Sequence, residues 1–177
     1  MSKTLIIYST VDGQTKAICQ TMADELSKAG ETVSMVSLAD AETEKLQAFD
    51  KILVGASIRY GKHRPELYRF VNNHHALLSA KKNAFFTVNV VARKPEKNTP
   101  ETNPYMQKFL QLSLWQPQLQ GVFAGKIAYP NYGLFDRSMI RLIMWITKGP
   151  TDISGTYEFT DWQRVKAFAA EFAELKA

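Results

Sequence analysis

The sequence has little cysteine and little histidine: one Cys and three His among 177 residues. With Cys19 alone, no internal disulfide can form, which fits a reducing compartment. The three histidines, His63, His74 and His75, form no metal-ligating pattern with it, so we expect no metal site. The first apolar run, residues 4–8, leads straight into a turn and is too short for a signal peptide.

The chain also lacks repeats, low-complexity tracts and linkers, so we expect a single domain spanning residues 1–177. Its charge is uneven. Residues 1–50 hold 4 basic and 8 acidic side chains, net −4, whereas residues 51–177 hold 18 basic and 9 acidic, net +9. This asymmetry is compatible with an anionic partner, such as a nucleic acid, a membrane surface or an acidic small molecule. Charge alone favours the simpler interpretation, a solvated basic surface.

Apolar runs of strand length alternate with helical patterns. The runs cover residues 4–8, 32–38, 51–56, 84–92 and 121–128. The helical patterns cover residues 15–29, 65–78, 104–115 and 161–175. Near-continuous apolar strands that alternate with helices indicate a parallel sheet covered on both faces. The fold class is therefore α/β, a doubly wound sheet of five parallel strands.

Residues 129–159 do not fit this alternation and form a long insertion interrupting strand five. We expect residues 155–159 to return to the sheet edge as a second half of that strand. Within the insertion, residues 134–148 predict an amphipathic helix with Arg137, Arg141 and Lys148 on one face. The same segment is open to other interpretations: an ordinary core helix, a helix that covers the cofactor pocket, or a helix that pairs with another subunit.

The loop between the first strand and the first helix reads "STVDGQT", residues 9–15. In an open parallel sheet, ligands bind beyond the carboxyl ends of the strands. The hydroxyls of Ser9, Thr10 and Thr15 and the backbone amides of the helix start can converge on one phosphate there. No lysine stands at the P-loop position, which argues against a nucleoside triphosphate and favours a flavin mononucleotide. The alternative is a simple turn in which Thr10 or Asp12 caps the helix.

Two further loops, "GASIRYGKHRPE" at 55–66 and residues 87–105, leave the sheet at the same edge. They are placed to hold a planar ring on either side of the phosphate loop.

Several motifs together resemble one family. They are the phosphate loop, "GASIRYG" at 55–61, "VNVVARKPEKNTPETN" at 88–103, "FDRSMIRLIMW" at 135–145 and "YEFTDW" at 157–162. They are similar to those of the flavodoxin-like bacterial protoporphyrinogen oxidases, which are quinone-dependent protoporphyrinogen IX dehydrogenases. The resemblance implies a flavodoxin-like fold, an FMN cofactor, and oxidation of protoporphyrinogen IX with menaquinone or ubiquinone as acceptor in haem biosynthesis.

The resemblance also implies the cofactor-binding residues. Those expected at the phosphate are Ser9, Thr10, Asp12, Gly13, Gln14 and Thr15. Those expected beside the flavin ring are Ser57, Ile58, Arg59, Tyr60, Gly61, Asn89, Val90, Val91, Ala92 and Arg93. No catalytic base stands out, because the cofactor carries the redox chemistry.

Basic residues near the proposed ring could pair with the two propionates of the substrate. The candidates are Arg59, Lys62, Arg64, Arg93 and Lys94. Because quinones dissolve in lipid, we expect contact with an anionic membrane surface through Arg137, Arg141, Trp145 and Lys148. The helix is too short and too charged to span a bilayer, which needs about 20 apolar residues. The expected location is peripheral, at the cytoplasmic face of the bacterial inner membrane.

Two other functional classes compete with this dehydrogenase. One is a flavodoxin-type single-domain electron carrier, and an isoelectric point near 9.3 argues against it because such carriers are usually acidic. The other is a nucleic-acid-binding or membrane-binding module on a scaffold that has lost its cofactor. The intact phosphate loop argues against that class, and we expect no nucleic-acid partner.

Overall fold

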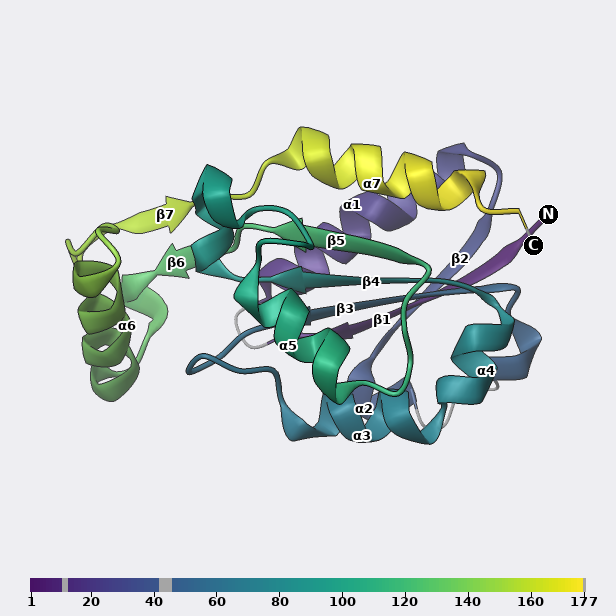
Figure 1. Cartoon of the computed structure of the whole chain (residues 1–177). Coiled ribbons are helices and arrows are strands. Elements are labelled where there is room, and N and C mark those ends of the chain that lie inside the picture. The colour runs from purple at the N-terminus through teal and green to yellow at the C-terminus, as the bar shows by residue number, and fades with distance from the viewer. Residues whose placement is uncertain (11–12, 42–45, 177) are drawn as a thin grey trace.

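The computed structural model describes residues 1–10, 13–41 and 46–176. At its centre lies a five-stranded parallel sheet of order β2-β1-β3-β4-β5, which confirms the predicted architecture (Figure 1). The strands are β1 Lys3–Ser9, β2 Thr32–Ser37, β3 Lys51–Ser57, β4 Lys82–Val88 and β5 Leu119–Phe123. The strand order reverses between β1 and β3, the position at which open α/β sheets bind ligands.

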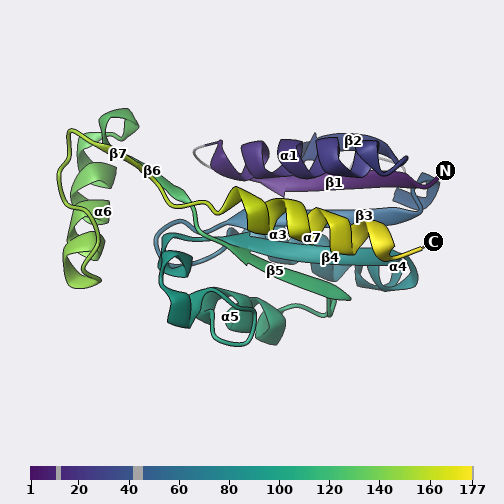
Figure 2. The same cartoon turned by 90° about the horizontal axis from the view of Figure 1, so that it is seen from above.

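Helices cover both faces of the sheet (Figures 1 and 2). On one face lie α1 Gln14–Lys28 and α7 Trp162–Glu174. On the other lie α2 Leu38–Ala41, α3 Pro65–Asn73, α4 His75–Ala80 and α5 Pro104–Leu112. Successive strand side chains point to opposite faces, so Leu5 and Ile7 pack in one core and Ile6 in the other. A Cβ at Gly55 would overlap the Phe86 ring, so the second core needs glycine there.

Several predicted bounds are wrong for local reasons. The fourth strand ends at Val88, not at residue 92, because the Asn89 side chain caps the 3₁₀ turn η2 Val90–Arg93. Residues 65–78 form two helices that meet at His74, which ends α3 and begins α4. Residues 104–115 are helical only to Leu112. The remaining 3₁₀ turns are η1 Leu46–Ala48, η3 Pro95–Lys97 and η4 Tyr129–Asn131.

The fifth predicted strand, residues 121–128, divides at Ala124 and Gly125 into β5 and β6 Lys126–Ala128. Strand β6 leaves the sheet and pairs antiparallel with β7 Thr156–Glu158. The expectation that residues 155–159 rejoin the sheet edge is therefore wrong. A two-stranded ribbon forms because the Phe159 N–H donates to the Gly125 carbonyl, 3.0 Å, and Thr160 Oγ1 donates to the Ala124 carbonyl, 2.7 Å.

Helix α6 Leu134–Ile146 packs at the end of this ribbon, beyond the carboxyl edge of the sheet (Figures 1 and 2). A small third core of Ile127, Tyr129 and Met144 joins the helix to the ribbon. None of the helices within the described parts of the chain has the length and apolarity needed to cross a bilayer.

Candidate functional site

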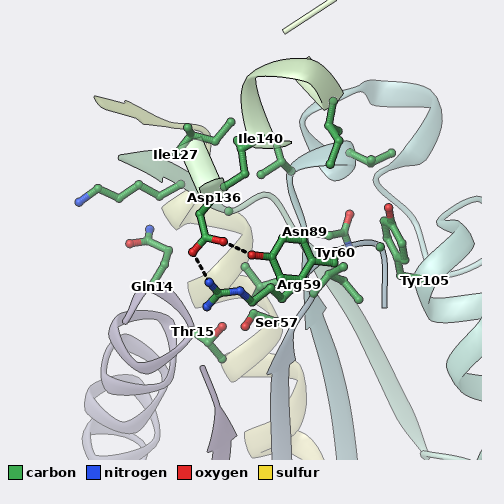
Figure 3. A pocket seen from close by; sticks show the side chains of 18 of the residues that line it. Gln14, Thr15, Ser57, Arg59, Tyr60, Asn89, Tyr105, Ile127, Asp136 and Ile140 are labelled. Carbon is green, nitrogen blue, oxygen red and sulfur yellow. Dashed lines mark hydrogen bonds and ion pairs between the residues drawn. The ribbon is translucent and has the colours of Figure 1, made fainter. Parts of the chain in front are cut away.

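A pocket of about 160 Å³ lies beyond the carboxyl ends of β1, β3 and β4 (Figure 3). The loops after these three strands form its walls, and α6 with the ribbon closes its outer side. It gathers eleven residues that the sequence predicted for the cofactor site: Thr10, Gln14, Thr15, Ser57, Ile58, Arg59, Tyr60, Gly61, Asn89, Val90 and Val91.

The start of α1 offers an anion site on the pocket wall. Gly13 occupies the N-cap with φ +87°, a left-handed conformation that favours glycine. No side chain among the described residues caps this helix. The Thr10 hydroxyl accepts from the Gly13 amide, 3.0 Å, so it shapes the loop and does not cap the first turn. Uncapped amides at a helix N-terminus attract anions.

The hydroxyl of Thr15 strengthens this assignment. Thr15 is 1% exposed and its Oγ1 has no hydrogen-bond partner within the described structure. Because a buried hydroxyl without a partner is unfavourable, this atom indicates a ligand at the helix start.

Three other predicted cofactor residues do not line the pocket. Ser9 is buried and borders a neighbouring hollow on the β2 side. Gly13 is the N-cap of α1, and Ala92 lies within η2. Asp12 is outside the described residues.

The side chain of Arg93, predicted to lie beside the flavin ring, contacts the end of α6. Its guanidinium donates to the carbonyl of Thr147, 2.9 Å, and to Oγ1 of the same residue, 3.2 Å. It also donates to the Val90 carbonyl, 3.0 Å. Thr147 is the C-cap of α6, so Arg93 fixes that end of the helix to the loop after β4. Arg93 is not among the residues that line the pocket.

The loop after β3 presents Arg59 and Tyr60 to the pocket. The backbones of Arg59 and Lys62 exchange two hydrogen bonds, of 3.0 and 3.3 Å, which close a tight turn. Within this turn Tyr60 and Gly61 have φ +52° and +77°. The Arg59 guanidinium and the Tyr60 hydroxyl both bind the carboxylate of Asp136 on α6 (Figure 3).

The loop after β4 rests on a buried polar network. The Asn89 amide donates to Asn103 Oδ1, 3.2 Å, and to Thr87 Oγ1, 3.4 Å, and the Asn103 amide donates back to Asn89 Oδ1, 3.0 Å. Thr87 Oγ1 lies 2.9 Å from His63 Nε2. Because this oxygen accepts from Asn89, its proton is available to the imidazole. The network fixes the Asn89 side chain at the pocket floor.

His63 at the end of this network is 3% exposed, and the rings of Tyr68, Phe85 and Phe109 surround it. Burial lowers the pKa of His63 from 6.5 to about 4, so the imidazole is neutral at physiological pH. The sequence analysis assigned His63 no part in this network.

The basic residues predicted to contact the substrate or the membrane do not all gather at the pocket or on one helix face. Lys62, Arg64 and Lys94 do not line the pocket. Lys148 lies beyond the end of α6 with φ +60°, so it does not share a helix face with Arg137 and Arg141.

The outward side of α6 is apolar. Of ten large exposed hydrophobic side chains in the described chain, six lie on this helix. They are Leu134, Phe135, Leu142, Ile143, Trp145 and Ile146. Only Met144 of the helix is buried, so the alternative of an ordinary core helix is wrong.

The structure adds pocket residues that sequence reasoning missed. They are Val88, Tyr105, Gly125, Lys126, Ile127, Tyr132, Asp136, Ile140, Ile143 and Met144. Most come from the ribbon and α6, whose position depends on the turn at Gly125. Lys126 forms no ion pair within the described residues, and it adds a second cation to Arg59.

Comparison with known proteins identifies the family. A family model described as a flavodoxin domain matches residues 5–154. Over 98% of its length, the chain is 46% identical to a protoporphyrinogen IX dehydrogenase [quinone] of Leishmania major, covering 75% of that protein. It is 43% identical to the protein of the same name from Escherichia coli K12, over 98% of this chain and 96% of that one. The chain belongs to the quinone-dependent protoporphyrinogen IX dehydrogenase family.

Solved structures confirm the fold of this dehydrogenase family member. Oxidised flavodoxin 1 of Bacillus cereus matches with a TM-score of 0.56 at 17% identity, over 99% of this chain and 100% of that one. The flavodoxin domain implies a flavin cofactor. The pocket fits such a group, because it joins an anion site bearing an unpartnered hydroxyl to two loops that flank one cavity.

The buried His63 predicts a pH dependence of stability. Its pKa is lower in the folded protein than in the unfolded chain, so acid protonates the unfolded state first. Stability is therefore lost as pH falls from about 6.5 towards 4.

The test is urea unfolding of wild type and His63→Gln at about pH 7 and about pH 4.5. The free energy of unfolding should fall between these pH values by about 2 to 3 kcal/mol less in His63→Gln than in wild type. His75→Gln, at an exposed imidazole, should behave as wild type. Equal pH slopes for wild type and His63→Gln would contradict the prediction.

Proposed function

We propose that the protein catalyses FMN-dependent oxidation of protoporphyrinogen IX to protoporphyrin IX in haem biosynthesis, with menaquinone or ubiquinone as acceptor. The observation that carries this proposal is the match to the Escherichia coli dehydrogenase, 43% identical over 96% of that protein. Full-length similarity at this level extends across the ribbon and α6 as well as the sheet.

The residues around the pocket suit FMN in particular. The phosphate would bind at the start of α1, where no described side chain caps the helix and the Thr15 hydroxyl has no partner among the described residues. The flavin ring would lie between residues 57–61 and 89–91. When bound, FMN supplies the redox chemistry two electrons at a time, so the six-electron oxidation consumes three quinones.

The chain itself contributes orientation and an apolar wall. Ile127, Ile140 and Met144 line the outer side of the pocket and exclude water from it. The two cations there, Arg59 and Lys126, suit a substrate that carries two propionates.

We also propose that α6 docks on an anionic bilayer at the cytoplasmic face of the bacterial inner membrane, as a peripheral contact. The supporting observations are its exposed apolar side, including Trp145 at 72%, and the exposed cations Arg141 and Lys148. A helix of this kind lies in the headgroup region. The lipid-soluble quinone would reach the pocket from the same side.

The catalytic proposal predicts quinone-dependent porphyrin formation. The FMN-loaded protein should convert protoporphyrinogen IX to fluorescent porphyrin under strict anaerobiosis only when a quinone is added. The measurement is porphyrin fluorescence over time, with heat-denatured protein as the control. A flavin-loaded protein that forms no porphyrin with either quinone would instead indicate an electron carrier.

The phosphate assignment predicts that Thr15→Val weakens FMN binding about tenfold, because one charge-assisted hydrogen bond is lost. Riboflavin, which lacks the phosphate, should bind the variant as well as wild type. Without ligand, the variant should be at least as stable as wild type, since the lost hydroxyl has no partner in the part of the chain that the structure describes. Flavin fluorescence titration measures both affinities. An equal loss for FMN and riboflavin would show that Thr15 does not contact the phosphate.

The membrane proposal predicts that Leu142→Gln lowers the affinity for phosphatidylglycerol vesicles about fivefold to tenfold, because apolar area no longer enters the interface. Leu112→Gln on α5 is the matched control, since the two leucines are 50% and 51% exposed. Co-sedimentation gives the affinity, and a blue shift of Trp fluorescence reports burial of Trp145. Similar vesicle binding by both variants would refute the docking role of α6.

A further inference from the structure

Asp136 stands out because it is an acidic residue inside a pocket assigned to a dicarboxylate substrate. One of its oxygens, Oδ2, binds the Arg59 guanidinium, and the other, Oδ1, accepts from the Tyr60 hydroxyl (Figure 3). The carboxylate thus has a charged donor and a neutral donor, one for each oxygen. Arg59 and Tyr60 together form a binding site that would accept any carboxylate in the same position.

The loop after β3 holds Arg59 and Tyr60 in place independently of Asp136. The backbone bonds between Arg59 and Lys62 close the turn, and Tyr60 adopts φ +52° within it. A non-glycine residue in this region is uncommon and points to a functional constraint. The Arg59 guanidinium also lies 5.2 Å from the Tyr60 ring centre, so the two donors are oriented together.

Helix α6 is fixed unequally at its two ends. Near its C-terminus, Arg93 binds Thr147 and the Met144 side chain is buried. Near its N-terminus, the attachments are Asp136 and a ring contact of 6.4 Å between Phe135 and Tyr60. Within the described residues, the Arg59–Asp136 pair is the one salt bridge of this helix.

We propose that Arg59 and Tyr60 form the subsite for a carboxylate of the substrate, and that Asp136 occupies this subsite until a substrate carboxylate displaces it. This inference rests on the proposed function, which supplies the dicarboxylate tetrapyrrole. Asp136 is then a specificity-determining residue, since a ligand must present a carboxylate or a similar anionic acceptor to take its place.

The exchange is energetically balanced. The incoming carboxylate makes the same contacts with Arg59 and Tyr60 that Asp136 gives up. The side chains of Arg59 and Asp136 are 39% and 25% exposed, so the released carboxylate returns easily to water. As long as Asp136 competes, the apparent affinity for substrate is reduced by the fraction of protein in which the subsite is open.

The test uses binding and not turnover. Protoporphyrin IX and its dimethyl ester are titrated into the FMN-loaded protein in the same detergent, and tryptophan quenching gives the two affinities. Asp136→Asn keeps the shape of the side chain and removes its charge. Asp152→Asn is the matched control, because it makes the same change of net charge in an exposed turn that does not line the pocket.

Asp136→Asn should bind the diacid about fivefold or more tightly than wild type, with no gain for the diester. Asp152→Asn should bind both the diacid and the diester with the affinity of wild type. In an Arg59→Gln background, Asp136→Asn should lose its effect. Equal diacid affinities for Asp136→Asn and wild type, an equal gain for the diester, or no porphyrin binding would each overturn the inference. Absence of turnover, with the expected binding pattern intact, would refute the proposed reaction and leave the carboxylate subsite standing.

Discussion

The pocket depends on one constraint, the alignment of parallel strands at a common edge of the sheet. Ser9 pairs with Ala56, and Val88 pairs with both Ser57 and Phe123, so four strands end side by side. Each loop that leaves this edge must therefore meet its neighbours. The anion site at α1, the turn that carries Arg59 and the network beneath Asn89 come together for this reason, although they are far apart in the sequence.

Helix α6 has apolar residues on both its pocket side and its outward side. Ile140 and Met144 line the pocket beside Asp136, whereas Leu142 and Trp145 are exposed on the outward side. An isolated soluble protein gains nothing from such an arrangement, because the apolar area stays in water. A bilayer would cover that area, and the lipid-soluble quinone would then be held on the side of the pocket that α6 closes.

Sequence patterns predicted the sheet, the phosphate loop and the two flanking loops, because these rest on local periodicity and on strand ends that must coincide. The ribbon escaped prediction because residues 121–128, apolar apart from Lys126 and of strand length, hide the break at Ala124 and Gly125. The partners of Arg93 could not be predicted either. The family resemblance placed this residue beside the flavin ring, but a long side chain can reach either the cavity or the helix end, and only the structure shows its bonds to Thr147. No local signal marks Asp136, whose partners lie 76 and 77 residues away.

The two proposals for α6 are coupled by geometry. Because Arg93 holds the C-terminal end of the helix, release of Asp136 would move mainly the N-terminal end, where Leu134 and Phe135 are exposed. These are also residues that would enter a bilayer. A substrate carboxylate that frees Asp136 would therefore favour insertion of this end, and a membrane that holds Leu134 and Phe135 would in turn lower the cost of opening the pocket. By linkage the two effects must be equal in free energy, so lipid and substrate would each strengthen the binding of the other.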